Sequence, residues 1–338
     1  YPPPGGLLPL RVALTEKLAF ENRIGCHPED VVVTAGATHG LVLALRALLA
    51  ADDELLVLAP YWPAVPGALG LVEGLRWRGV SAYLDVLEGA LPPAALAERL
   101  RANLRPWTRA LYLNTPNNPT GAVLSREHLA AIAEVAGEHD LWVVSDETYE
   151  HIHFDDAGHV SFGALPGMAE RTVSLFSFSV SHAMAGWRLG YVVAPPALRP
   201  TLAPALATLT THGVFPAVQL AGLAALKGSP RAVETMRQAY RERRDLFFAQ
   251  LAGQSVLCAT RPAGAFYVFV NVAAALEGRS VWDLVREWLE LGIAVLPGTA
   301  FGPYPGHVRF SLAARKEDVS EAVRRLREHH AAARTTSG

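Results

Sequence analysis

The first two thirds of the chain alternate short apolar runs, rich in β-branched residues, with stretches that have a helical pattern. The apolar runs cover residues 31–34, 54–58, 110–113, 141–144 and 172–176. Helical stretches such as 39–49 and 126–138 fall between them. Strands that alternate with helices in this way are typical of a mainly parallel sheet covered by helices. Because such sheets bind ligands beyond the carboxyl ends of their strands, the residues that follow each run are the first candidates for a site.

The pattern changes near residue 216. A long helical region rich in arginine and other charged residues covers 232–251, and a strand with alternating aromatic residues follows at 264–270. With 338 residues, of which 51% are hydrophobic, the chain is long enough to bury two cores. We therefore expect an α/β fold with a three-layer, mainly parallel sheet in a large domain over residues 1–215, and a smaller α+β domain over residues 216–338.

Charge and cysteine content exclude several classes of function. The net charge is −2, the isoelectric point is about 6.7 and the charges are spread along the chain, so we expect no nucleic acid and no membrane partner. Cys26 and Cys258 form no metal-binding pattern with histidine, so we expect no metal site. The first residues lack the pattern of a signal peptide. Together these features predict a cytoplasmic protein that acts on a small molecule.

Gly36, Ala37 and Thr38 open a helical stretch directly after the first apolar run. Free backbone N–H groups and the helix dipole at such a point form a site for an anion, although many strand-to-helix turns contain glycine without binding one. Ser177 and Arg188 flank a later segment and would add a hydroxyl and a charged fork to the same phosphate. Without the other motifs, we would interpret Ser177 as a turn residue and Arg188 as a surface residue without a ligand.

Two more specific segments follow later apolar runs. Residues 114–121 read Asn-Thr-Pro-Asn-Asn-Pro-Thr-Gly, and the prolines and glycine fix a turn that presents the Asn118 amide at the end of the sheet. Residues 145–149 read Ser-Asp-Glu-Thr-Tyr. Asp146, at the end of its strand, is either a helix cap or a buried anion that awaits a cation.

With residues 177–188, Ser-Phe-Ser-Val-Ser-His-Ala-Met-Ala-Gly-Trp-Arg, these motifs resemble those of class I/II aminotransferases, the fold-type I enzymes that depend on pyridoxal phosphate (PLP). The resemblance extends from Tyr1 to about Leu326. It implies that Asp146 holds the protonated pyridine nitrogen, and that Asn118 and Tyr149 hydrogen-bond the phenolic oxygen of the ring.

The resemblance also assigns the remaining contacts. It implies that Trp62 stacks on the cofactor ring, and that Gly36, Ala37, Thr38, Ser177 and Arg188 bind the phosphate. It implies a homodimer as well, because Tyr1 matches a tyrosine whose hydroxyl reaches the phosphate of the neighbouring subunit. Arg309 matches the arginine that binds the substrate carboxylate, with Asn118 beside it. Its apolar neighbours Val308 and Phe310 agree with that role, because a buried guanidinium without an anion is costly.

The chain departs from the family at the lysine that forms the Schiff base, because Val180 stands at that position. Valine forms no imine and carries no proton, so Val180 is inert. The loss of a positioned general acid–base lowers a rate by about 10²–10⁴-fold. The family's N-terminal arm is also absent from this sequence. His182 and Tyr149 are the candidates to replace the lysine as proton carrier, although a histidine or an aromatic residue at position 182 is common in relatives that keep the lysine.

Three interpretations follow from the substitution. In the first, the protein binds PLP, its amine form PMP or a PLP–amino acid adduct noncovalently, and acts on an amino acid or a 2-oxo acid without a lysine. In the second, it is a noncatalytic aminotransferase-fold protein that binds a ligand or a partner subunit. In the third, it is an ordinary amino acid aminotransferase whose lysine was replaced by engineering.

Overall fold

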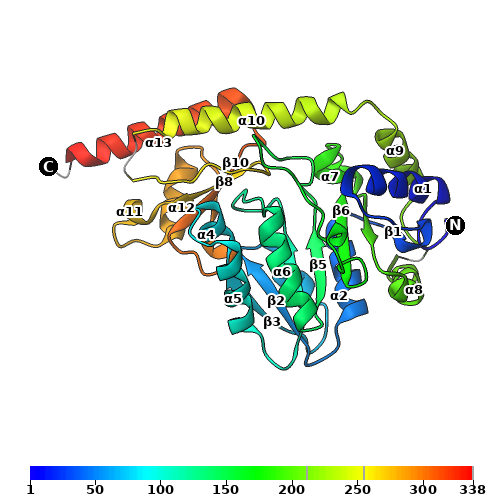
Figure 1. Cartoon of the computed structure of the whole chain (residues 1–338). Coiled ribbons are helices and arrows are strands. Elements are labelled where there is room, and N and C mark those ends of the chain that lie inside the picture. Colours follow the sequence, from blue (N-terminus) through cyan, green and yellow to red (C-terminus); the bar gives the residue numbers. More distant parts are fainter. Residues whose placement is uncertain (211, 254–255, 337–338) are drawn as a thin grey trace.

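The computed structural model describes residues 1–210, 212–253 and 256–336, and two β-sheets organise this part of the chain (Figure 1). The first sheet has the strand order β1-β7-β6-β5-β4-β2-β3, and the second has the order β8-β10-β9. The strands are β1 (Val31–Thr34), β2 (Glu54–Ala59), β3 (Arg76–Ser81), β4 (Thr108–Asn114), β5 (Trp142–Asp146), β6 (Thr172–Ser177), β7 (Gly190–Val193), β8 (Tyr267–Asn271), β9 (Leu296–Pro297) and β10 (His307–Ser311).

The first sheet is mainly parallel, which confirms the predicted fold class. Strands β2 to β6 pair in parallel, whereas β7 runs antiparallel to both β6 and β1. Strand β1 therefore points the same way as β6, and the carboxyl ends of β1, β2, β4, β5 and β6 lie at one edge. The apolar runs predicted these five strands but not β3, which is largely exposed, or β7, which has four residues and begins with glycine.

Helices cover both faces of the first sheet, as expected for a three-layer fold. One face packs against α2, α3 and α8, and the other packs against α4, α5 and α6 at one end and α1 and α9 at the other. None of the described helices is both long and apolar enough to cross a membrane. These helices are α1 (Leu8–Lys17), α2 (Ala37–Leu48), α3 (Ala64–Leu69), α4 (Tyr83–Leu87), α5 (Pro93–Asn103), α6 (Arg126–Glu138), α7 (Phe178–Ser181), α8 (Arg199–Thr210) and α9 (Pro216–Leu226).

The second sheet is small and antiparallel, and it has its own core around Trp288 and Phe310. Its helices are α10 (Arg231–Leu251), α11 (Ala273–Leu276), α12 (Val281–Glu290) and α13 (Lys316–Thr336). The long helices α10 and α13 lie side by side along it (Figure 1). A domain division between residues 215 and 216 stays a prediction. Helix α9, which follows that point, packs beside α1 on the first sheet.

Candidate active site

The predicted site residues meet at the edge where the parallel strands of the first sheet end. Asp146 is the last residue of β5, and Ser177 is the last residue of β6. Asn118 lies in the loop after β4, and Trp62 follows β2. The Asn117 side chain donates to the Pro60 carbonyl at 3.2 Å and so ties the loops after β4 and β2 together.

Asp146 is a buried carboxylate held by neutral donors. It accepts hydrogen bonds from the Thr148 backbone N–H and hydroxyl, at 3.1 and 2.7 Å, and from the Tyr112 hydroxyl at 2.9 Å. In the described part of the chain no cation lies within ion-pair distance of it. Burial raises the pKa of Asp146, although these hydrogen bonds oppose the rise. Asp146 therefore caps a turn, because the described residues 147–161 form no helix, and it is a buried carboxylate without a cation beside it. The helix-cap alternative is wrong, and the buried carboxylate is what the structure shows.

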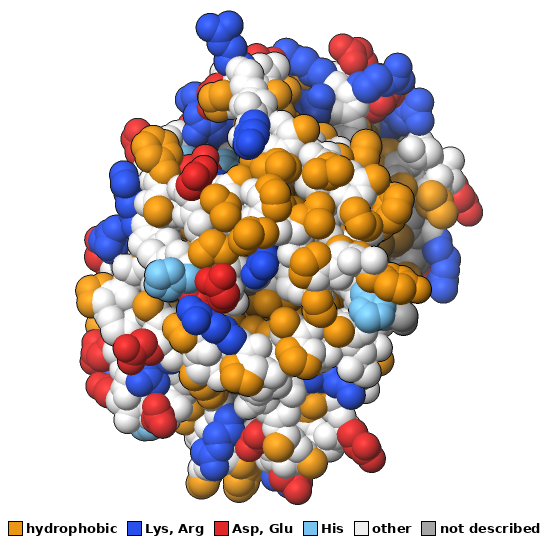
Figure 2. All heavy atoms as spheres, turned by 90° about the vertical axis from the view of Figure 1, so that its right-hand side faces the viewer, with side chains coloured by type: hydrophobic (Ala, Val, Ile, Leu, Met, Phe, Trp, Pro, Cys, Tyr) orange, Lys and Arg blue, Asp and Glu red, His pale blue; other side chains and the backbone are white. Residues whose placement is uncertain are grey.

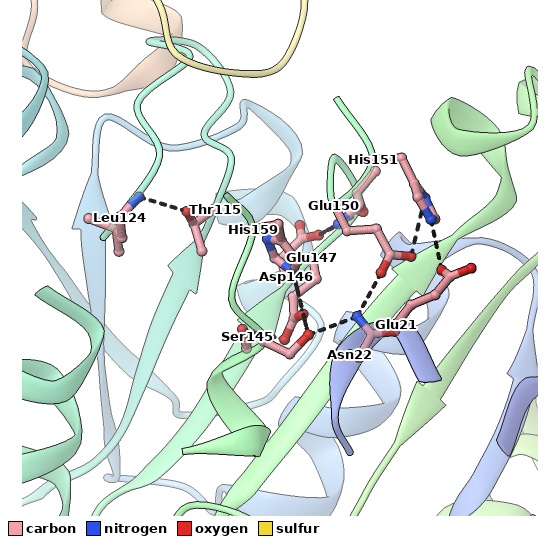
Figure 3. A network of polar contacts seen from close by, with 12 residues as sticks. Glu21, Asn22, Thr115, Leu124, Ser145, Asp146, Glu147, Glu150, His151 and His159 are labelled. Carbon is pink, nitrogen blue, oxygen red and sulfur yellow. Dashed lines mark hydrogen bonds and ion pairs between the residues drawn. The ribbon is translucent and has the colours of Figure 1, made fainter. Parts of the chain in front are cut away.

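A network of polar side chains beside Asp146 fixes the turn after β5 (Figure 3). Glu147 accepts hydrogen bonds from the Ser145 and Ser161 hydroxyls, at 3.0 and 2.5 Å, and lies 2.8 Å from His159 Nε2. Glu150 continues the network by accepting from Asn22 and pairing with Lys17 at 2.5 Å. Burial would raise the pKa of Glu150, but the Lys17 ammonium and nearby histidines outweigh it and lower this pKa to about 2. Asp146 and Tyr149 thus project from a rigid segment.

Asn118, Tyr149 and Arg309 form a continuous chain of hydrogen bonds, although they lie on different elements. Asn118 Nδ2 donates to the Tyr149 hydroxyl at 3.3 Å, and Arg309 Nη1 donates to Asn118 Oδ1 at 3.0 Å. Burial raises the pKa of Tyr149 well above its ordinary value, so its hydroxyl keeps its proton at neutral pH. The arrangement joins the loop after β4 to β10 of the second sheet.

Arg309 is a half-buried guanidinium without an anionic partner among the described residues. Its guanidinium carbon lies 4.3 Å from the centroid of the Tyr267 ring and 4.9 Å from that of the Phe301 ring. Its buried Nε has no hydrogen-bond partner. Burial lowers the pKa of Arg309 from its ordinary value. A guanidinium in this state is suited to a carboxylate ligand, which would supply both the missing acceptor and the missing charge.

The predicted phosphate ligands also converge. Gly36 precedes α2 with φ +89°, and a Cβ atom there would lie 2.5 Å from Arg188 Nη2. Gly190 lies opposite Ser177 in the sheet, and a Cβ atom on it would lie 2.9 Å from the Ala37 nitrogen. The start of α2, Arg188 and Ser177 are therefore neighbours, with Thr38 in the first turn of α2. Arg188 itself is exposed, and it donates to the Ala35 carbonyl at 3.3 Å.

Val180 lies in the short helix α7, directly after β6, and packs against the aromatic cluster that contains Tyr149 and Tyr267. The three lysines of the chain lie on other elements. Lys17 forms an ion pair with Glu150 in the network described above. The Lys316 ammonium lies 3.7 Å from the Glu242 carboxylate, and Lys227 directly follows α9. An apolar side chain therefore stands beside Tyr149.

The structure does not bring His182 together with Asp146 and Asn118. Its ring packs against Phe178, with centroids 5.0 Å apart, and lines a cavity of about 970 Å³ between α1 and the start of α10. Burial and the neighbouring His151 lower the pKa of His182 to about 4. The physical reason is that α7 ends at Ser181 and the backbone at His182 leaves the helical conformation, with φ −122° and ψ 13°. His182 is thus neutral at neutral pH and faces a different cavity.

Trp62 and Tyr1 make their contacts with residues other than Asp146, Asn118 and Arg309. Trp62 packs partly against the core on the α2 side of the sheet. Tyr1 is fully exposed and stacks on His212, with ring centroids 4.4 Å apart. In the described ranges no group of three His, Cys, Asp or Glu side chains is placed to hold a metal ion.

Sequence reasoning missed three aromatic residues of the site: Tyr112, Tyr267 and Phe301. Tyr112 and Tyr267 lie in apolar strands, where an aromatic side chain needs no function to explain it, and Phe301 ends a short Gly-Thr-Ala-Phe turn. The one signal was the alternation of aromatic residues at 264–270, which marked a strand but not its role.

Comparisons with known proteins show which family the chain resembles. The sequence profile of the family "Aminotransferase class I and II" matches residues 1–326. The chain is 39% identical to aspartate/prephenate aminotransferase of Thermus thermophilus, over 96% of this chain and 82% of the relative. It is 38% identical to arginine–pyruvate transaminase of Pseudomonas aeruginosa, over 94% of this chain and 79% of the relative.

Solved structures give the same result. The structure of Thermus thermophilus aspartate aminotransferase with maleate aligns with a TM-score of 0.88 at 38% identity, over 96% of this chain and 82% of that one. The aromatic aminotransferase of Pyrococcus horikoshii aligns with a TM-score of 0.88 at 36% identity, over 96% and 86%. On sequence and fold, this chain belongs to the class I and II aminotransferase family.

Proposed function

We propose that this protein binds PLP or PMP noncovalently and acts on an amino acid or a 2-oxo acid by chemistry that uses no lysine. The observation that carries the proposal is Asp146. A buried carboxylate that only neutral groups satisfy, at the point where five parallel strands end, is suited to a protonated ring nitrogen. The family provides the matching cofactor, because its members depend on PLP.

The residues of the site fit each part of PLP. Asp146 would hold the ring nitrogen, Asn118 and Tyr149 would bind the ring oxygen, and Trp62 would stack on the ring. Gly36, Ala37, Thr38, Ser177 and Arg188 would hold the phosphate, since α2 offers free N–H groups beside a guanidinium. When bound in this way, PLP supplies an electron sink for bonds at the α-carbon of an amino acid.

Arg309 would bind the carboxylate of the amino acid or 2-oxo acid. Its hydrogen bond to Asn118, which also bonds Tyr149, would place that carboxylate next to the cofactor ring. The aromatic faces of Tyr267 and Phe301 exclude water from the guanidinium and so strengthen its attraction for an anion.

The proton chemistry differs from that of lysine-bearing relatives. Val180 carries no proton, His182 lines another cavity, and Tyr149 keeps its proton at neutral pH. Water or the substrate itself would then move the proton, at a rate about 10²–10⁴-fold below that of a positioned lysine. The same packing of Val180 favours a second candidate function, in which the protein binds PLP and a carboxylate ligand without turnover.

A second copy of this chain would complete the site. Figure 2 shows apolar side chains gathered on the face that carries α1, α8 and α9. Phe215 precedes α9 and Leu220 lies within it, and these side chains are 69% and 54% exposed. The N-terminal residue Tyr1, which is assigned to the neighbour's phosphate, lies on the same side of the molecule (Figure 1). Sedimentation should show a dimer that Leu220→Glu converts to monomers. Leu289→Glu, an exposed change on α12, is the control. A monomeric wild-type protein would overturn this arrangement.

Turnover separates the two candidate functions. The PLP-loaded protein is incubated in D₂O with each common amino acid, and NMR follows loss of the α-hydrogen while a coupled assay follows 2-oxo acids. We expect exchange or product above the rate of free PLP with at least one amino acid, and loss of that rate in Arg309→Leu. Saturable PLP binding without any exchange or product would reject lysine-independent catalysis and support the binding function.

A further inference from the structure

Tyr267, the first residue of β8, connects the two halves of the site. Its side chain is buried, and its hydroxyl lies 3.1 Å from the hydroxyl of Tyr149. The ring also lies under the guanidinium of Arg309, 4.3 Å from the guanidinium carbon. One side chain thus contacts the residue assigned to the cofactor ring and the residue assigned to the carboxylate.

The direction of the bond between the two hydroxyls decides what Tyr149 can do. Asn118 Nδ2 already donates a hydrogen bond to the Tyr149 oxygen, and the Tyr149 hydroxyl has a single proton with which it can donate one in turn. If Tyr149 donates to Tyr267, its proton is used up within the protein. If Tyr267 donates to Tyr149, the Tyr149 proton is free for an acceptor outside the pair. An electron-rich oxygen on a bound ring selects the second arrangement.

The ring of Tyr267 has a separate effect on Arg309. The guanidinium has no anionic partner among the described residues, and its contacts are one amide oxygen and the faces of Tyr267 and Phe301. An aromatic face attracts a cation, and the attraction is stronger where water is excluded from the pair. Tyr267 therefore keeps the fork of Arg309 in place before a carboxylate arrives.

We propose that Tyr267 is a positioning residue that acts on both halves of the site: its hydroxyl donates to Tyr149 and turns the Tyr149 proton toward the ring oxygen of PLP, and its ring holds Arg309 for the carboxylate. The proposal rests on the proposed function, in which PLP and a carboxylate bind here. It assigns the two effects to different atoms of one side chain, and two substitutions separate them.

The test measures the dissociation constants of PLP and of maleate by titration of the purified protein. Tyr267→Phe removes only the hydroxyl, so PLP binding should weaken by about 3- to 10-fold, the value of one neutral hydrogen bond, while maleate binding stays within about twofold. Tyr267→Leu also removes the ring, so both ligands should bind more weakly. Tyr240→Phe is the matched control, because Tyr240 stacks on Phe266, which packs beside Tyr267, and loss of its hydroxyl should leave both constants unchanged.

A double-mutant cycle distinguishes positioning from a general loosening of the structure. If Tyr267 acts through Tyr149, Tyr267→Phe should have no further effect on PLP binding in a Tyr149→Phe background. Three results would overturn the inference: unchanged PLP affinity in Tyr267→Phe, an equal loss for PLP and maleate in that variant, or the same loss in the Tyr149→Phe background. A wild-type protein that binds no PLP would instead reject the proposed function itself.

Discussion

Replacement of Arg309 by leucine should abolish binding of carboxylate ligands without loss of stability. Hydrogen bonds to charged groups contribute about 1.5–3 kcal/mol each, and a carboxylate would accept two from the guanidinium. A loss of about 3 kcal/mol corresponds to at least a 100-fold rise in the dissociation constant. The substitution also removes a half-buried cation that has no anion beside it, so the relief of its desolvation offsets the lost contacts with Tyr267 and Phe301.

Two measurements check this prediction. Isothermal titration with maleate should give at least 100-fold weaker binding for Arg309→Leu, and Arg309→Lys should fall between, because lysine keeps the charge but not the fork. Urea denaturation of the ligand-free protein should give a free energy of unfolding within about 1 kcal/mol of wild type.

Arg243→Leu is the matched control, because Arg243 also lies over a tyrosine ring, 5.4 Å from the centroid of Tyr240, but donates to the Leu312 carbonyl instead of Asn118. It should leave maleate binding unchanged. The reasoning is refuted if Arg309→Leu binds maleate as well as wild type does, or if the ligand-free variant is less stable by several kcal/mol.

Substitutions at Asp146, His182 and Val180 test the charge, the burial and the direction of these three side chains. Asp146→Asn should stabilise the ligand-free protein but weaken PLP binding. Since burial raises the pKa of Asp146, its ionisation costs stability as pH rises above about 4, and the gain seen by urea denaturation should therefore grow with pH; no gain at pH 7 would contradict this. His182 has a pKa lowered to about 4, so the stability it contributes is fully present above pH 6.5 and is lost as pH falls toward 4. His182→Phe should reduce the slope of unfolding free energy against pH in that window, by at most about 1.4 kcal/mol per pH unit, and an unchanged slope would be inconsistent with a buried neutral imidazole. Val180→Lys should form a covalent bond to PLP that borohydride makes permanent, visible as added mass at residue 180; failure to form it would mean that α7 does not direct this side chain to the cofactor.

The sequence predicted the residues whose role depends on their place at a strand end. Asp146 and Asn118 follow apolar runs, and parallel strands bring such positions to one edge whatever the distance between them in sequence. The residues proposed to bind the phosphate belong to the same class, since Gly36 and Ser177 also lie at or just beyond the ends of strands. This part of the site follows from strand order and direction alone.

The remaining contacts depend on tertiary packing that a local pattern does not encode. Tyr112 and Tyr267 meet partners 34 and 118 residues away, and in sequence each is an aromatic residue in an ordinary strand. His182 shows that nearness in sequence does not fix where a side chain lies. It lies two residues from Val180 but just beyond the end of α7, and its ring lines the cavity between α1 and α10, whereas Val180 packs against the cluster of Tyr149 and Tyr267.

We propose that this site holds PLP without a covalent bond, and mass spectrometry tests this directly. Wild-type protein is mixed with PLP, reduced with borohydride and examined by native and denaturing mass spectrometry. We predict that the native protein carries one PLP per chain that dialysis removes, and that the denatured chain has the mass of its sequence alone. No PLP on the native protein, or a reduced adduct on Lys17, Lys227 or Lys316, would contradict the claim.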